Sequence, residues 1–95
     1  LKVDREWRRF ELGSICCFEA YGNYVKVWQA EQYTLASITL KQLRQQLAGA
    51  FVQVHKSFVI NKDKVLAVEH ELLRLDGDQQ VKVGKLYKHR LIGLL

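Results

Sequence analysis

Short stretches in which apolar and polar residues alternate run through most of this chain. They predict β-strands, because successive side chains of a strand face opposite ways. The clearest alternation is in 24–30 (YVKVWQA), where Val25 and Val27 would share one face. Less regular stretches predict two short strands within 1–12 and others at 15–20, 33–37, 65–68, 72–75 and 80–83. Residues 51–60 begin as a strand, but the alternation is lost over 56–61, which predicts a bend or one helical turn there.

A helical spacing of leucines distinguishes one segment, 39–48. Thr39, with Gln42 three residues later, fits a capping box at its start, and Gly49 follows where a helix commonly ends. Three leucines would line its buried face: Leu40, Leu43 and Leu47. A shorter helix, interrupted by Gly93, is predicted at the C-terminus.

Turns are predicted where Gly, Asn and Asp gather, because these residues tolerate the backbone angles of tight turns. They fall at 13–14, 21–23 and 76–78, and Gly84 ends the last strand pattern. A further hairpin turn is predicted at Glu31 and Gln32, between the strands at 24–30 and 33–37. About eight or nine short strands and one clear helix indicate a mostly antiparallel β fold. From these patterns we expect a sandwich or a partly closed barrel, with the helix closing one edge.

The length of 95 residues suits one domain with one core. No apolar run approaches the roughly 20 residues of a membrane span, and no signal-peptide pattern opens the chain. Because Met is absent, we expect residues 1–95 to be a single domain cut from a longer protein, with a further region on its N-terminal side. The adjacent Cys16 and Cys17 favour reduced, apolar strand residues in a cytoplasmic protein, and a redox switch is the alternative.

Basic residues outnumber acidic ones by 15 to 10, and their placement is uneven. Residues 41–64 hold five basic side chains and one acidic, and residues 82–95 hold four basic and none acidic. The segment between them, 65–81, is acidic. Clustered positive charge is typical of a surface that binds a polyanion, so nucleic acid is a candidate partner against the alternative of an ordinary solvated surface.

Catalytic and metal-binding motifs are absent from the sequence. The histidines are scattered, and none belongs to a nucleophile elbow, an HExxH motif or a P-loop. His55 and Ser57 would share a strand face, but no acidic residue nearby in sequence could orient the histidine. Since zinc-type Cys/His spacing is also missing, we expect no enzyme activity, no cofactor and no metal ion.

Three short segments carry the cations, amides and hydroxyls that contact nucleic-acid phosphates and bases. The first is the turn 21–24 followed by Lys26, and the second is 55–57 (HKS). The third is 82–88 (KVGKLYK), where lysines alternate with small and aromatic residues.

Four motifs, in order and at the expected spacing, resemble the LytTR (LytR/AlgR-type) family of DNA-binding domains. The central motif is 51–61 (FVQVHKSFVIN), followed by Lys64 and Val65. The other three are 15–27 (ICCFEAYGNYVKV), 39–47 (TLKQLRQQL) and 83–87 (VGKLY). The resemblance extends over about residues 3–92.

The resemblance implies a mostly β fold of three small, mainly antiparallel sheets in an elongated domain with one or two short helices. It implies duplex DNA binding by loops, from different sheets, that enter successive major grooves. Such domains usually end a response regulator of a two-component system, after a receiver domain that a sensor kinase phosphorylates. They commonly bind paired promoter repeats as dimers, so we expect a transcription regulator that is a homodimer at full length.

By position in the motifs, the resemblance assigns ten residues to three DNA-facing loops. They are Asn23, Tyr24 and Lys26 in the first, His55, Lys56 and Ser57 in the second, and Lys85, Tyr87, Lys88 and Arg90 in the third. Base reading is expected from Asn23, Lys26 and Lys85, which can hydrogen-bond purine edges. Phosphate anchoring is expected from Lys56, Ser57 and Lys88, and Arg90 is a further contact to the DNA backbone. For His55 we favour a packed structural role, and we expect Asn61 to cap a turn.

The chain departs from the family pattern at Cys16-Cys17, where branched apolar residues are commoner, and at Leu86, where many members have a polar or basic residue. Val25 also occupies a loop position that is polar in other members. The alternative function is a β interaction module for a protein or acidic ligand. Its surface would be the apolar C-terminal residues Leu91, Ile92, Leu94 and Leu95. RNA binding is disfavoured because no aromatic strand pair of the RNP type is present.

Overall fold

Ten strands form three antiparallel sheets in the computed structural model, which describes residues 1–94 and their side chains apart from that of Ile92. The N-terminal sheet pairs β1 (Lys2–Val3) with β2 (Glu6–Trp7). The central sheet has the order β5 (Gln32–Ala36), β4 (Tyr24–Gln29), β3 (Cys17–Tyr21), β7 (Phe58–Asn61) and β6 (Phe51–His55). The third sheet has the order β10 (Gln79–Lys82), β9 (Leu72–Leu75) and β8 (Val65–Glu69).

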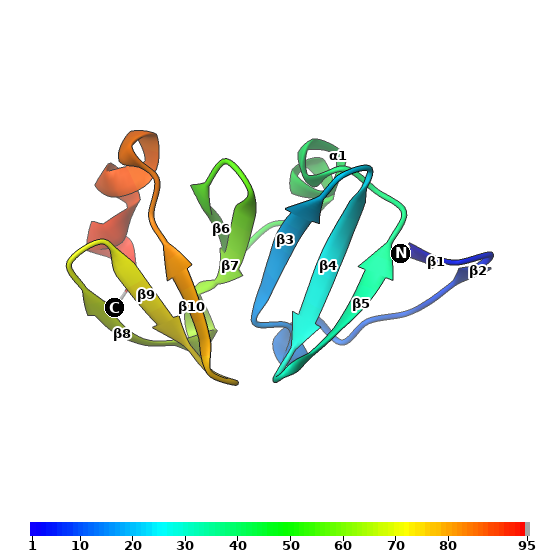
Figure 1. Cartoon of the computed structure of the whole chain (residues 1–95), viewed down its shortest axis with the longest axis horizontal. Coiled ribbons are helices and arrows are strands. Elements are labelled where there is room, and N and C mark those ends of the chain that lie inside the picture. The colour runs from blue at the N-terminus through cyan, green and yellow to red at the C-terminus, as the bar shows by residue number, and fades with distance from the viewer. Residues whose placement is uncertain (95) are drawn as a thin grey trace.

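One α-helix and two 3₁₀ helices lie between these strands, and a third 3₁₀ helix follows the last strand, within residues 1–94. They are α1 (Leu40–Gln46), η1 (Leu12–Ser14), η2 (Lys62–Lys64) and η3 (Lys85–Gly93). The molecule measures 40 × 24 × 22 Å, and Figure 1 shows the sheets side by side along its length. The predicted elongated fold of three small antiparallel sheets is therefore confirmed. None of the helices described is long and apolar enough to cross a membrane.

The expected sandwich or barrel is wrong, because the buried residues form two clusters, one on each face of the central sheet. On the first face, Phe18 of β3 lies opposite Val27 of β4 and Val59 of β7. Leu40 and Leu43 of α1 belong to the same cluster. The helix therefore covers a face of the sheet and does not close its edge.

The second cluster joins the central sheet to the third sheet. Cys17 lies opposite Ile60 in the β3–β7 pairing, and both are fully buried. They share this cluster with residues of the third sheet and of the strand that leaves it: Leu73, Leu75, Val81 and Val83. The middle of the central sheet is therefore apolar on both faces. An alternating pattern predicts a strand with one polar face, so it does not reveal a sheet of this kind.

The bend or helical turn predicted over 56–61 is wrong. Lys56 and Ser57 form a tight turn, Phe58–Asn61 is the strand β7, and the helical turn comes afterwards as η2. Three of the four residues of β7 are buried. A strand that is buried on both faces shows no alternation, and this absence of alternation led to the wrong prediction.

The helix α1 has the predicted capping box, with the Thr39 hydroxyl accepting from the Gln42 backbone N–H and the Gln42 side chain accepting from the Thr39 N–H. It ends at Gln46, two residues earlier than predicted, because Leu47 is already extended. Leu47 still packs on the first cluster, so the leucine stripe is right although the helix is shorter.

The C-terminal helix is a 3₁₀ helix, η3, and the leucines at its end turn inward. Leu94 is buried in the second cluster, and Leu91 packs against it. The apolar surface expected for a protein-interaction module is therefore not exposed at these two positions. The other two positions of that expectation, Leu95 and the side chain of Ile92, lie outside the described part of the chain.

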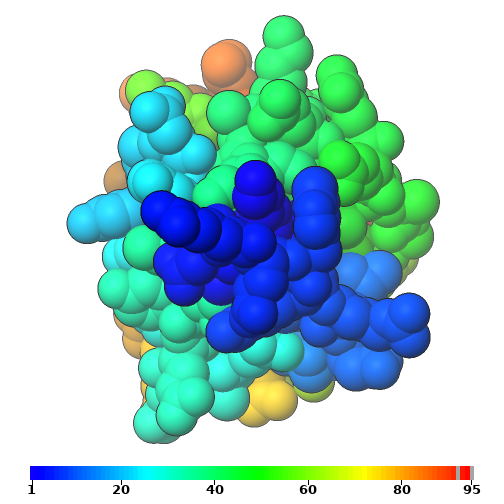
Figure 2. Space-filling model, turned by 90° about the vertical axis from the view of Figure 1, so that its right-hand side faces the viewer, coloured from blue at the N-terminus to red at the C-terminus, as the bar shows by residue number. Residues whose placement is uncertain are grey.

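The N-terminal sheet covers one end of the central sheet. The Ser37 N–H donates to the Lys2 carbonyl over 2.8 Å, and Val3 is buried. Figure 2 shows the N-terminal segment, in dark blue, spread over this end of the molecule beside the green helical region. This cover lies next to the end of the edge strand β5, where exposed strand edges otherwise invite pairing with other chains.

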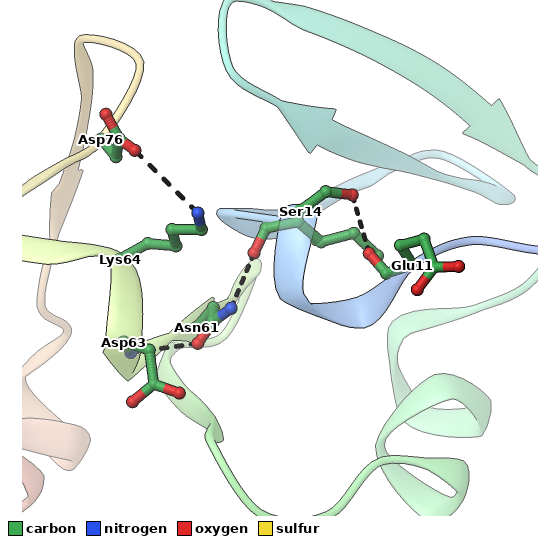
Figure 3. A network of polar contacts seen from close by, with 7 residues as sticks. Glu11, Ser14, Asn61, Asp63, Lys64 and Asp76 are labelled. Carbon is green, nitrogen blue, oxygen red and sulfur yellow. Dashed lines mark hydrogen bonds and ion pairs between the residues drawn. The ribbon is translucent and has the colours of Figure 1, made fainter.

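Asn61 ties the end of β7 to the segment before β3, as Figure 3 shows. Its Nδ2 donates to the Ile15 carbonyl over 2.9 Å, and its Oδ1 accepts from the Asp63 N–H over 3.0 Å. Lys64, in the helix that Asn61 caps, forms an ion pair of 4.0 Å with Asp76 of the third sheet's β9–β10 turn. The prediction that Asn61 caps a turn is confirmed.

The third sheet also touches the central sheet at a turn that requires glycine. Gly77, between β9 and β10, has φ +83°, and a Cβ built on it would lie 2.7 Å from Cα of Ala30 in the β4–β5 turn. The two turns meet at the lower side of Figure 1. A side chain at Gly77 would therefore suffer both backbone strain and a clash with main-chain atoms.

We expect Gly77→Ala to lower the free energy of unfolding by more than the strain of a positive φ alone, which is about 1–3 kcal/mol. Gly22→Ala is the matched control, because Gly22 has φ +59° but open space around its Cβ position. Gly13→Ala has neither constraint and should stay within about 0.5 kcal/mol of the original chain. Urea denaturation of the three variants measures this, and equal losses for Gly77→Ala and Gly22→Ala would show that the contact with Ala30 is unimportant.

Candidate nucleic-acid interface

The three segments predicted to face DNA lie on the same side of the molecule. They are the β3–β4 turn at Gly22 and Asn23, the β6–β7 turn at Lys56 and Ser57, and the start of η3 after Gly84. Figure 1 shows all three on the upper side, spaced along the long axis. The first two belong to the central sheet and the last follows β10 of the third sheet, so three turns come from two sheets.

Backbone hydrogen bonds fix these segments relative to one another. The Ala20 N–H, next to the first turn, donates to the Ser57 carbonyl of the second over 2.8 Å. The Gly84 N–H donates to the Val54 carbonyl, also over 2.8 Å, and attaches the start of η3 to β6. A partner that contacts all three segments would therefore meet a preformed surface.

In the first turn, Asn23 and Tyr24 are exposed at the tip. Lys26 lies two residues into β4 and is half-buried on the sheet face. Its Nζ lies 4.5 Å from the ring centroid of Tyr21 and 4.7 Å from that of Tyr33, as in cation–π contacts. The structure therefore brings Asn23 and Tyr24 together at the tip but holds Lys26 between two tyrosines.

In the second turn, His55 supports the backbone. Its Nδ1 accepts from the Ser57 N–H over 3.0 Å, and its ring packs edge-on against Phe58, with centroids 5.7 Å apart. An accepting Nδ1 leaves the proton of a neutral imidazole on Nε2. These contacts fit the structural role favoured for His55, while Lys56 remains exposed and Ser57 is half-buried.

In the third segment, Arg90 and Tyr87 attach η3 to the central sheet. Arg90 Nη1 donates to the Gln53 carbonyl over 2.8 Å, and its guanidinium lies 5.3 Å from the centroid of the Tyr87 ring. A Cβ on Gly84 would lie 3.2 Å from Tyr87 Cδ2 and 3.5 Å from His55 Cδ2, so the second and third segments are in close contact.

Lys88, predicted to anchor a phosphate, forms an ion pair with Glu71 of the β8–β9 turn. The hydrogen bond from Lys88 holds the pKa of the exposed Glu71 carboxyl below its ordinary value. Within residues 1–94, neither Lys56 nor Lys85 has an ion-pair partner. The candidate interface therefore contains two lysines without an ion pair in residues 1–94 and one lysine, Lys88, that is already paired with a carboxylate.

The sequence analysis did not predict that Lys88 and Lys26 have partners within the protein. Glu71 is seventeen positions from Lys88, and Tyr33 reaches Lys26 from the neighbouring strand. No local spacing signals such contacts, because they depend on how separate hairpins pack. Leu86, which the sequence singled out as a departure, lies between Lys85 and Tyr87 and is highly exposed.

Other kinds of site receive no structural support in the described residues. Within 1–94, no group of three or more His, Cys, Asp or Glu side chains is arranged to hold a metal ion. Cys16 and Cys17 are free and buried. The adjacent Cys16 thiol and burial raise the pKa of the Cys17 thiol, so Cys17 is a neutral core residue. The alternative that Cys16 and Cys17 form a redox switch stays a hypothesis.

Comparisons with known proteins agree with the fold described above. The family model of the LytTr DNA-binding domain matches residues 5–95. A solved structure of the LytTr DNA-binding domain from a Bacillus cereus protein, described as a methyl-accepting/DNA response regulator, superposes with a TM-score of 0.81. The two chains share 23% sequence identity, and the match covers 99% of this chain and 92% of the other. None of the curated proteins matches the sequence.

The likeness to the Bacillus cereus domain shows the fold, and the family match extends over nearly the whole chain. The chain therefore belongs to the LytTR family of DNA-binding domains.

Proposed function

We propose that this domain binds duplex DNA sequence-specifically by placing turns from its central and third sheets in successive major grooves, and that it regulates transcription in this way. The observation that carries the proposal is the alignment of the three turns along one side of a molecule 40 Å long. Successive major grooves on one side of B-DNA are about 34–36 Å apart. A molecule of this length can therefore reach two successive major grooves.

The exposed tips suit base reading, and the flanking cations suit phosphate binding. Asn23 and Lys85 are the best-placed base readers, because an amide and an ammonium can hydrogen-bond purine edges in the major groove. Lys56, Ser57 and Lys88 would hold phosphates, with Tyr24 beside the first turn. Lys26 could reach a base only by leaving its contacts with the two tyrosines. It is therefore the weakest of the three base readers expected from the sequence.

Arg90, Tyr87 and His55 would act mainly by holding the segments in place. Arg90 and His55 already use nitrogen atoms in hydrogen bonds to the protein backbone. Arg90 has further N–H groups that could donate to a phosphate, since a guanidinium carries five.

We further propose that the domain is the output part of a two-component response regulator in the cytoplasm. A sensor kinase would phosphorylate a receiver domain elsewhere in the protein, and the full-length protein would bind paired promoter repeats as a homodimer. Family resemblance supports this context, as does the response-regulator description of the Bacillus cereus protein.

Selection of bound duplexes from a random-sequence DNA pool, near physiological salt, tests the proposal. We expect enrichment of a short motif. Two copies of it about one helical turn apart would in addition support the dimer, because half-site spacing follows the geometry of a dimer. Retention that depends steeply on salt but selects no motif would contradict sequence-specific binding. Absence of retention would contradict DNA binding by this chain and leave a protein-interaction module as the next hypothesis.

Lys56→Ala and Lys85→Ala should separate phosphate binding from base reading. We expect Lys56→Ala to weaken selected and random duplexes alike and to reduce the salt slope by about 0.9, the value of one lost phosphate contact. Lys85→Ala should cost about 1–3 kcal/mol, mainly on the selected site.

Lys62→Ala is the control for these variants, because Lys62 is exposed in η2 at the opposite end of β7 from the second turn. Titrations of the original chain and of the three variants with both duplexes, over a range of salt, measure these affinities. The same loss for Lys56→Ala and Lys85→Ala on both duplexes would refute the division of roles.

Glu71→Gln should strengthen DNA binding, because it frees Lys88 for a phosphate. We expect higher affinity for any duplex and a salt slope steeper by about 0.9. Glu69→Gln removes the same charge from an exposed β8 residue that has no ion pair within residues 1–94. Equal gains for the two variants would mean that net charge, and not the release of Lys88, changes the affinity.

A further inference from the structure

Leu86 is the most exposed large hydrophobic residue in the described chain, at 84%. It is the second residue of η3, directly after Lys85, and its neighbour Tyr87 turns inward against Arg90. The core is therefore complete without Leu86.

The position of Leu86 is defined by the surrounding backbone. Gly84 is hydrogen-bonded to Val54 of β6, and the Tyr87 N–H donates to the Gly84 carbonyl over 2.9 Å. Arg90, one turn further, is hydrogen-bonded to Gln53. The first turn of η3, orange in Figure 1, is thus held at the upper side with Leu86 facing solvent.

The surroundings of Leu86 are cationic. Lys85, which has no ion pair in residues 1–94, precedes it, and Lys88, which is paired with Glu71, lies within the next turn of η3. An exposed leucine between lysines is poorly suited to an apolar protein partner, because docking would bury the ammonium groups beside it. The same arrangement suits duplex DNA, where phosphates and purine edges satisfy the lysines.

The major groove offers one apolar group to such a leucine, the C5-methyl of thymine. We propose that Leu86 contacts a thymine methyl and so determines specificity at a base pair next to the one read by Lys85. This inference rests on the proposed function, since it requires the start of η3 to enter a major groove.

The test compares thymine with uracil at each position of the duplex that the chain selects from a random pool. Deoxyuridine pairs as thymidine does but lacks the methyl group. We expect one or two dT→dU replacements to lower affinity about fourfold, the equivalent of one buried methyl group. In Leu86→Ala the same replacements should cost nothing, and Leu86→Met should keep the discrimination.

Leu66→Ala is the matched control, because Leu66 is a leucine 61% exposed on β8, away from the three turns. It should retain the full sensitivity to uracil. Since Leu86 is exposed, far-UV circular dichroism should show the same fold for Leu86→Ala as for the original chain.

Three results would overturn the inference and leave the proposed function standing. They are insensitivity to uracil at every position, an equal uracil penalty in Leu86→Ala, and a change of oligomeric state in Leu86→Ala with unchanged DNA preference. Failure to select any motif would overturn the proposed function and this inference together.

Discussion

Antiparallel pairing of β3 with β7 joins two hairpins that lie about forty residues apart in the sequence. Successive pairs face opposite sides of the sheet, with Cys17 and Ile60 in the second cluster and Phe18 and Val59 in the first, so the same strand pairing supports both clusters. The pairing continues as the Ala20–Ser57 hydrogen bond, which fixes the β3–β4 turn beside the β6–β7 turn, the first two turns of the proposed DNA interface. Stability of the core and arrangement of the interface therefore depend on one strand pair, and a change that weakens it should affect both.

The cations of the interface differ in what they already contact. Lys26, Lys88 and Arg90 have partners within the protein, whereas Lys56 and Lys85 have no ion pair in residues 1–94. A cation that leaves an internal partner for a phosphate contributes only the difference between the two contacts. The unpaired lysines are therefore expected to supply most of the affinity, and the paired side chains to keep the surface in shape.

Sequence patterns predicted the fold well where the pattern has one interpretation. The alternation around Val25 and Val27, the capping box at Thr39 and the turn at Gly77 all form as expected. The sequence patterns failed to predict the strand β7, because it is buried on both faces and its residues do not alternate between apolar and polar. They also suggested one enclosed core, because alternation shows that a strand has a buried face but not which element covers it.

The sequence by itself determined the strand-rich fold, the family and the segments that carry exposed polar groups. Those properties depend on the local spacing of apolar residues, on the turn residues and on the order of the motifs along the chain. Only the tertiary structure decided which side chains remain available to a binding partner. In it Lys26 lies between two tyrosines, Lys88 forms an ion pair with Glu71, and Leu86 is exposed to solvent. The physical reason is that availability depends on contacts between hairpins distant in sequence, and these contacts are set by packing in three dimensions.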